Sequence, residues 1–262
     1  MNIDVNGIRF NVSITGKPEG EVLVLSHSLC TNLAMWDEQM AALATDFRVL
    51  RYDTRGHGAS DAPEGAYTLE QLGEDAIGLL DALGIEKVIW LGLSMGGMIG
   101  QSIALHHPQR LEKLILASTA AVMGDQLQPV WQDRISRAQS TGMSSLVAEI
   151  LERWFSPAFL EANPPPVQRI RQQILSTPVP GFIGCCEAIR HLDYLERIAA
   201  IQMPTLIMVG EDDPGTPVAF SEAIHARIAE SRLCLIPAAR HLCNIEKSQA
   251  FNARLLEFLS ER

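Results

Sequence analysis

The sequence predicts an α/β fold: a mainly parallel sheet covered by helices on both faces, with a helical cap inserted into it. Short, continuous apolar runs recur along the 262-residue chain, as expected for strands buried on both faces of a parallel sheet. Segments with a helical periodicity of apolar residues lie between these runs, as crossover helices do between parallel strands. The alternation stops for one long stretch, and this interruption predicts the cap.

Each predicted strand rests on its own apolar run. Residues 8–15 alternate between apolar and polar side chains, which is typical of a strand with one exposed face. Glycine and proline in residues 16–20 then predict a turn before the first continuous run. The continuous runs, and therefore the predicted buried strands, are residues 21–26, 47–52, 88–91, 114–117, 205–209 and 233–236.

Helices are predicted where apolar residues recur with the period of an α-helix. These segments connect successive strands and would cover the two faces of the sheet. They are residues 36–44, 69–83, 98–106, 217–228 and 245–259.

The stretch without strands contains helical patches separated by two proline-containing breaks, at residues 163–166 and 177–180. Its apolar content, which includes Trp131 and Trp154, is too high for a solvated linker. We therefore predict a folded helical insertion. The predicted domains are an α/β core, residues 1–120 and 196–262, and the inserted cap, residues 121–195.

The composition is that of a globular protein. Apolar residues make up 47% of the chain, and no run approaches the roughly 18 apolar residues that a membrane span needs. Acidic residues outnumber basic ones by 31 to 21, and a formal charge of −10 lacks the positive footprint of a nucleic-acid-binding protein. We therefore expect neither a membrane nor a nucleic acid as a partner, and a monomer or small homo-oligomer.

The cysteines and the N-terminus favour a cytoplasmic protein. The cysteine count is odd, the spacing is not that of a metal site, and two cysteines are adjacent, which disfavours a disulfide between them. Residues 1–7 lack the basic start and the apolar core of a secretory signal. Because no phosphate-binding loop, dinucleotide fingerprint or metal cluster is visible, we expect no cofactor and no metal.

A Gly-x-Ser-x-Gly pentapeptide, from Gly92 to Gly96, lies between a predicted strand and a helical run. In this context the motif is typical of a nucleophile elbow, a strained turn that exposes its central serine, here Ser94. The glycines are needed because side chains at those positions would collide with the neighbouring strand and helix. The pentapeptide also occurs by chance in ordinary glycine-rich turns, so the rest of the chain decides between the two interpretations.

A serine nucleophile needs a base, and an imidazole held by a carboxylate serves this purpose best. Two polar segments downstream of Ser94 follow predicted strands at their carboxyl ends, where open α/β sheets place their sites. The second segment contains His241, which we predict to be the base; the alternative is an ordinary loop histidine. The first contains three consecutive carboxylates, of which we favour Asp213, with Asp212 as the runner-up and Glu211 as a solvated side chain.

Several segments carry a resemblance to a known family. They are residues 25–29 (Leu-Ser-His-Ser-Leu), 51–60, 92–97 and 152–155 (Glu-Arg-Trp-Phe), and the pair His241-Leu242 followed by residues 244–246. Over nearly its whole length the chain resembles the α/β-hydrolase family, and within it the 3-oxoadipate enol-lactonases. The resemblance implies the α/β-hydrolase fold and a small-molecule lactone substrate. The implied reaction is the hydrolysis of 3-oxoadipate enol-lactone to 3-oxoadipate through an acyl-enzyme, in aromatic-compound degradation by the β-ketoadipate pathway.

The resemblance also implies roles for individual residues. The family's acid lies in a Gly-x-x-Asp-x-x-Thr-Pro pattern, and this further favours Asp213. The matching residues are Gly210, Asp213, Thr216 and Pro217. The tetrahedral intermediate needs two N–H donors for its oxyanion, and the resemblance assigns the backbone groups of Leu29 and Met95.

The chain departs from the family at two cysteines. Cys30 stands where a glycine is common beside the oxyanion loop, and Cys243 stands where a serine is common. We expect both to be small buried residues without chemistry, although Cys30 could narrow the pocket. The Arg-Gly-His-Gly segment, residues 55–58, matches a family loop whose expected role is structural support, so His57 is not predicted to be a base.

The cap should anchor the substrate carboxylate in a compact apolar pocket with one or two cationic or polar groups. Trp131 and Arg134 lie three residues apart on a predicted helix, so both side chains can face one cavity. Arg153 and Trp154 are the second choice. The alternative in each case is an arginine in surface ion pairs and a tryptophan in the core of the cap.

Other functions compete with the lactonase hypothesis. A general carboxylesterase or a cofactor-free perhydrolase would use the same triad on another acyl group, so only substrate profiling separates them. A dehalogenase or an epoxide hydrolase needs a carboxylate nucleophile at the elbow, and Ser94 argues against both. A non-enzymatic ligand-binding protein is disfavoured by the complete set of Ser94, Asp213 and His241.

Overall fold

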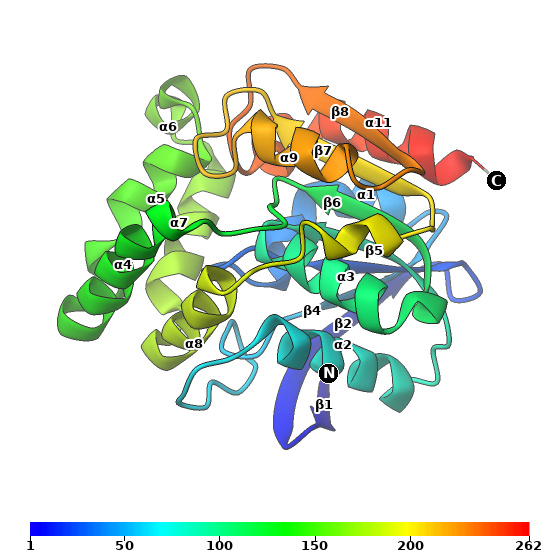
Figure 1. Ribbon diagram of the computed structural model, residues 1–262, viewed down its shortest axis with the longest axis horizontal. Coiled ribbons are helices and arrows are strands. Elements are labelled where there is room, and N and C mark those ends of the chain that lie inside the picture. The colour runs from blue at the N-terminus through cyan, green and yellow to red at the C-terminus, as the bar shows by residue number, and fades with distance from the viewer. Residues whose placement is uncertain (262) are drawn as a thin grey trace.

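A computed structural model describes residues 1–261, and within this range eight strands form a single sheet. The strand order is β1-β2-β4-β3-β5-β6-β7-β8; strands β3 to β8 pair in parallel, and only β1 and β2 pair antiparallel with their neighbours (Figure 1). The predicted mainly parallel α/β sheet is therefore confirmed. The strands are β1 (Asn2–Val5), β2 (Ile8–Gly16), β3 (Val22–Ser26), β4 (Arg48–Tyr52), β5 (Val88–Leu93), β6 (Leu111–Ala117), β7 (Thr205–Gly210) and β8 (Ser231–Ile236).

Helices cover both faces of this sheet, which is why its central strands are continuous apolar runs. Every residue of β5 and of β7 is buried. Helices α2 and α3 pack against each other, and α1 packs against α11 on the opposite face (Figure 1). In the part of the chain that the structure describes, no helix combines the length and the hydropathy needed to cross a membrane. The covering helices are α1 (Asp37–Leu43), α2 (Leu69–Ala82), α3 (Met95–His106), α9 (Val218–His225), α10 (Cys243–Glu246) and α11 (Ser248–Ser260).

The structure differs from the sequence-based prediction at four places, besides shifts of up to three residues at the ends of other elements. Strand β8, predicted to be buried, lies at the edge of the sheet, and of its residues only Ile236 is buried. Strand β1 was not predicted, because it is a short edge strand with no buried residue that pairs with β2 through a tight turn at Asn6 and Gly7, both with positive φ. Helix α3 begins three residues before the predicted start, directly after Ser94. The predicted helix 245–259 is two helices, because the backbone leaves the helical conformation at Lys247.

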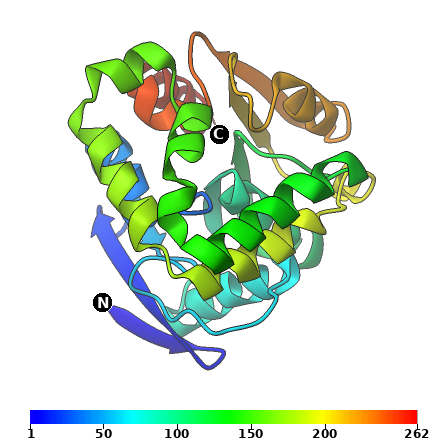
Figure 2. The same cartoon turned by 90° about the vertical axis from the view of Figure 1, so that its left-hand side faces the viewer.

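Between β6 and β7 the chain forms the helices that we call the cap helices, α4 to α8. Both proline-rich breaks lie at helix starts. Proline is favoured there because it has no backbone N–H, and the N–H groups of the first turn have no partner within the helix. Helices α4 and α8 lie side by side, and the group stands at one end of the molecule (Figures 1 and 2). The cap helices are α4 (Gln128–Thr141), α5 (Val147–Trp154), α6 (Pro157–Ala162), α7 (Pro165–Ser176) and α8 (Val179–Arg190).

Candidate active site

Ser94 occupies a sharp turn between β5 and α3. Its backbone angles, φ 56° and ψ −114°, lie where residues with a side chain are strained. A Cβ on Gly92 would lie 2.0 Å from the carbonyl oxygen of Gly96, and one on Gly96 would lie 2.1 Å from a carbonyl oxygen of β3. Only glycine fits at these two positions, so the local sequence is the one that this turn requires. The turn carries Ser94 to the edge of a pocket.

Asp213 and His241 lie after β7 and β8 and contact each other. Oδ2 of Asp213 lies 2.8 Å from Nδ1 of His241, and both side chains are buried. The other oxygen of Asp213, Oδ1, accepts hydrogen bonds from the backbone N–H groups of Gly215 (2.7 Å) and Thr216 (3.0 Å). Asp212 and Glu211 are exposed instead. The structure therefore brings Asp213, and neither of its acidic neighbours, against the imidazole.

The environment of Asp213 keeps its carboxylate ionised. Burial alone would raise the pKa of Asp213, but attraction to His241 and hydrogen bonds from His241 and Thr216 outweigh burial and lower it. The Thr216 hydroxyl donates to Oδ2 at 2.7 Å, the same oxygen that faces the imidazole. A carboxylate held in this way fixes the proton of the imidazole on Nδ1 and leaves Nε2 free to accept another.

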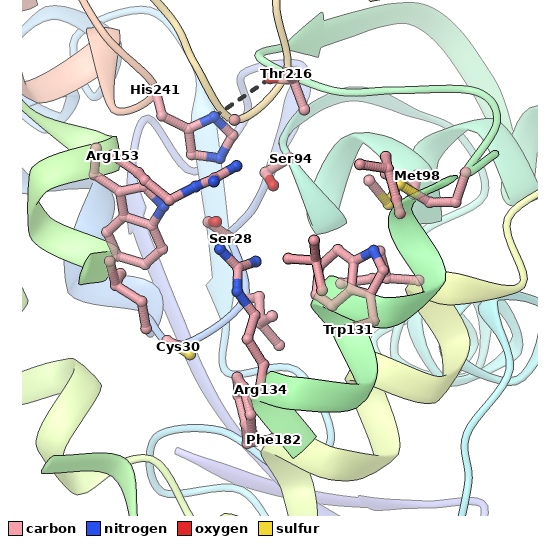
Figure 3. Close-up of a pocket in the computed structure, with 18 residues that line it drawn as sticks. Ser28, Cys30, Ser94, Met98, Trp131, Arg134, Arg153, Phe182, Thr216 and His241 are labelled. Atoms are coloured by element: carbon pink, nitrogen blue, oxygen red, sulfur yellow. Dashed lines mark hydrogen bonds between the residues drawn. The ribbon is translucent and has the colours of Figure 1, made fainter. Parts of the chain in front are cut away.

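His241 and Ser94 face the same pocket (Figure 3). Trp154 stacks on the imidazole, with ring centroids 6.1 Å apart and an angle of 25° between the planes. Among residues 1–261, no hydrogen bond joins the Ser94 hydroxyl to His241 (Figure 3). Such contacts are often long in a ligand-free site and shorten when a substrate is bound.

Two backbone N–H groups beside Ser94 have no acceptor within the described residues. They belong to Leu29, in the loop after β3, and to Met95, the first residue of α3. Helix N-termini leave such donors free, and they favour negative charge nearby. Leu29 lines the pocket together with Ser94, and Met95 directly follows the serine in the chain.

The pocket has a volume of about 100 Å³ and is mainly apolar. Cap helices α4 and α5 supply one wall, which includes both predicted pairs of anchors: Trp131 with Arg134, and Arg153 with Trp154. Within the described residues, no aspartate or glutamate lines the pocket. A pocket with two arginines and no carboxylate favours an anion, although the whole chain carries a net charge of −10.

The two arginines differ in their surroundings. Arg134 lies over the ring of Trp131, 5.3 Å from its centroid, and forms an ion pair with Glu149 at 3.0 Å. Arg153 forms no ion pair among residues 1–261 and makes only a 3.4 Å hydrogen bond to a backbone carbonyl. Burial and repulsion by Arg134 lower the pKa of Arg153. Arg153, the second choice from the sequence, is therefore the pocket cation that forms no ion pair. Both guanidinium groups point toward Ser28 and Ser94 (Figure 3).

The side chain of Ser28 was not singled out from the sequence. It is 1% exposed and lines the pocket, and its hydroxyl has no hydrogen-bond partner in the described part of the chain. Buried polar atoms are rarely left unpaired, so this hydroxyl is available to a bound ligand. The only sequence signal was its place between His27 and the predicted donor Leu29.

The two unusual cysteines are both buried. Cys30 lines the pocket with φ +63°, a conformation that glycine adopts most readily. Burial raises the pKa of the Cys30 thiol, and it raises the pKa of Cys243 to about 12. Both thiols are therefore protonated at neutral pH, which makes them poor nucleophiles. In residues 1–261 no group of three or more His, Cys, Asp or Glu side chains is placed to hold a metal ion.

Together, this turn, the Asp213–His241 contact and the two free N–H groups have the arrangement of a serine hydrolase site on an α/β sheet. The family model of the alpha/beta hydrolase fold matches residues 21–248. The chain belongs to this family, and it is a hydrolase of the α/β-hydrolase superfamily.

Among its relatives are enol-lactonases. The chain is 37% identical to 3-oxoadipate enol-lactonase 2 of Acinetobacter baylyi, over 94% of this chain and 91% of that protein. The chain shares 39% sequence identity with the enol-lactonase from Burkholderia xenovorans LB400, and its structure matches the crystal structure of that protein with a TM-score of 0.96 over 100% of both chains. A hydrolase from Pseudomonas aeruginosa is 43% identical, also with a TM-score of 0.96, over 100% of this chain and 98% of that one.

Proposed function

We propose that the protein is a serine hydrolase that opens the ring of 3-oxoadipate enol-lactone and releases 3-oxoadipate. The observation that carries this proposal is the pocket itself, which joins Ser94 and His241 to the unpaired cation Arg153 and to Arg134, with no carboxylate in its lining. A small ester that bears a carboxylate matches that lining in size and charge. The likeness to the enol-lactonases supports this particular substrate.

In the proposed mechanism, His241 removes the proton of the Ser94 hydroxyl as that oxygen attacks the lactone carbonyl. Asp213 holds the imidazole in the required tautomer and stabilises its positive charge. The N–H groups of Leu29 and Met95 donate to the oxyanion of the tetrahedral intermediate. When the ring C–O bond breaks, the leaving enol oxygen takes the proton from His241, and the chain is left with an acyl group on Ser94.

The second half of the reaction uses the same groups. The enol tautomerises to a ketone, which removes the oxygen nucleophile that would close the ring again. His241 then takes a proton from water as the water attacks the acyl carbon, and collapse of the second intermediate frees Ser94. We further propose that the protein acts in the cytoplasm, in the β-ketoadipate pathway of aromatic-compound degradation. Its partner is the small lactone substrate, and it is a monomer or a small homo-oligomer.

The test is a comparison of two substrates. We expect kcat/KM for freshly generated 3-oxoadipate enol-lactone to exceed that for p-nitrophenyl acetate by about 10- to 100-fold, because only the lactone carries a carboxylate, and a hydrogen-bonded charge is worth about 1.5–3 kcal/mol. Steady-state kinetics of both substrates measure this ratio. Efficient turnover of the acetate with a slow lactone reaction would favour a general carboxylesterase or a perhydrolase. Turnover of neither would favour a binding protein.

The anchoring role of Arg153 has its own test. Arg153→Gln is expected to raise KM for the lactone by about 10- to 100-fold, with a smaller effect on kcat, because it removes a charged contact present in both the bound and the transition state. Arg134→Gln should have a smaller effect, since Arg134 already forms an ion pair with Glu149. Kinetics of both variants, with the exposed Arg254→Gln as the control, measure this difference. Equal KM values for Arg153→Gln and wild type would exclude Arg153 as the anchor.

A further inference from the structure

The loop that carries Leu29 is fixed by three hydrogen bonds to one carbonyl oxygen. The oxygen of Ser28 accepts from Nδ1 of His27 at 2.8 Å, from the Thr31 hydroxyl at 2.8 Å and from the Thr31 backbone N–H at 3.2 Å. All of these residues are buried. The carbonyl of Ser28 is therefore held in one direction from several sides.

The proton of His27 must lie on Nδ1 for this arrangement to work. Its other nitrogen, Nε2, accepts a hydrogen bond from the Thr54 backbone N–H at 2.9 Å, so Nε2 carries no proton. The ring is fully buried, and burial lowers the pKa of His27 to about 4. The neutral tautomer with a proton on Nδ1 is therefore the form present at neutral pH, and it donates to Ser28.

Peptide geometry carries this constraint to Leu29. The carbonyl of Ser28 and the N–H of Leu29 belong to the same planar trans peptide, so they point in opposite directions. A carbonyl turned toward His27 and Thr31 thus directs the Leu29 N–H the other way. That N–H has no acceptor within residues 1–261, and Leu29 lines the pocket beside Ser94.

A second histidine holds the next peptide. Nε2 of His57 accepts a hydrogen bond from the Cys30 backbone N–H at 3.0 Å, and the rings of His27 and His57 lie 5.3 Å apart. Cys30 has a positive φ, so the loop turns sharply after Leu29. With successive peptides held by two buried imidazoles, the peptide between Ser28 and Leu29 is not free to rotate.

We propose that His27 is a positioning residue of the active site: by holding the Ser28 carbonyl oxygen, it turns the Leu29 N–H toward the oxyanion that forms when Ser94 attacks. This inference rests on the proposed function, which makes the Leu29 N–H an oxyanion donor. His27 itself does not touch the substrate. Oxyanion donors act because they are oriented before the reaction, so a peptide that can rotate loses much of its effect on the transition state.

Two amide substitutions separate this role from a general structural one. In His27→Asn the amide nitrogen lies near the position of Nδ1 and can still donate to the Ser28 carbonyl oxygen. In His27→Gln the amide lies near the position of Nε2, where its oxygen can accept from the Thr54 N–H but nothing donates to Ser28. We expect kcat for p-nitrophenyl acetate to fall by about 10- to 100-fold in His27→Gln, less than the full loss of an oxyanion donor. His27→Asn should keep about tenfold more of kcat, and KM should change by less than about threefold in both. The exposed His225→Gln is the control.

A boronic acid provides the readout that a structural role would not change. Phenylboronic acid forms a tetrahedral adduct with an active-site serine and places an oxygen where the oxyanion forms. Its inhibition constant should rise in His27→Gln by about the same factor as kcat falls, because both report the same transition-state contact. An inhibition constant that stays at the wild-type value while kcat falls would overturn the proposal, and so would wild-type kcat in both variants.

Two further variants keep the test decisive. If the His27 variants fail to fold, Thr31→Val removes the hydroxyl that donates to Ser28, together with its longer contacts to His27 and Met35, and keeps the shape of the side chain. We then expect kcat and boronate affinity to fall together by several-fold, and unchanged boronate affinity would contradict the proposal. Ser94→Ala distinguishes the two hypotheses: hydrolysis that survives it overturns the proposed function, whereas hydrolysis that needs Ser94 but not His27 overturns only the present inference.

Discussion

Replacing Ser94 by alanine is expected to lower kcat by about 10⁴- to 10⁶-fold on every ester or lactone that the protein hydrolyses. The proposed mechanism has no other nucleophile, since the Cys30 thiol in the same pocket is held protonated by burial. Binding of the substrate should persist, because the apolar wall and the two arginines are unchanged. Active-site titration and steady-state kinetics with the purified variant measure the loss.

The strained backbone of Ser94 adds a second expected result to this experiment. Ser94→Gly should be as inactive as Ser94→Ala but more stable than it by about 1 kcal/mol, because relief of a backbone strain of 1–3 kcal/mol exceeds the entropic penalty of glycine. Denaturant unfolding of both variants tests this difference. Activity in either variant above about one thousandth of wild type would contradict the assignment of Ser94 as nucleophile.

The sequence was most informative where function depends on local geometry. A turn as tight as that at Ser94 admits only glycine at two flanking positions, so five consecutive residues are enough to predict this turn. Asp213 and His241 follow strands, and parallel strands bring their carboxyl ends to one edge of the sheet. These placements need only strand order and short loops, both of which the apolar runs reveal.

Residues whose roles depend on the packing of distant segments could not be ranked from the sequence. Arg134 and Arg153 both lie in the predicted cap, but only the contact between α4 and α5 shows that Glu149 pairs with Arg134 and leaves Arg153 unpaired. The tautomer of His27 likewise depends on Thr54, which is 27 residues away. In both cases one partner of the interaction comes from another element, and hydrophobic periodicity carries no information about it.

The matched pair Asp213→Asn and Asp212→Asn should differ by about 10⁴-fold in kcat. In Asp213→Asn the amide oxygen can still accept hydrogen bonds from the backbone N–H groups of Gly215 and Thr216, so the loop keeps its shape. The amide NH₂ group then faces His241 and favours the tautomer that cannot take the serine proton. The exposed Asp212 contacts neither group, so its variant should retain wild-type activity. Kinetics at neutral pH decide between them, and comparable losses in both would leave the acid unassigned.

The stability difference between wild type and Asp213→Asn has an expected dependence on pH. Because the pKa of Asp213 is lowered in the folded protein, the ionised carboxylate stabilises the fold above the unfolded pKa of about 3.9, and this contribution is lost as the pH falls through the lowered value. The stability advantage of wild type over Asp213→Asn should therefore be complete at pH 7 and shrink as the pH falls below about 4. Urea unfolding of both proteins across this range measures it. A difference that is constant from pH 7 to pH 3 would mean that the Asp213 carboxylate gains nothing from the imidazole and the Thr216 hydroxyl, which would remove the physical basis for its role in orienting His241.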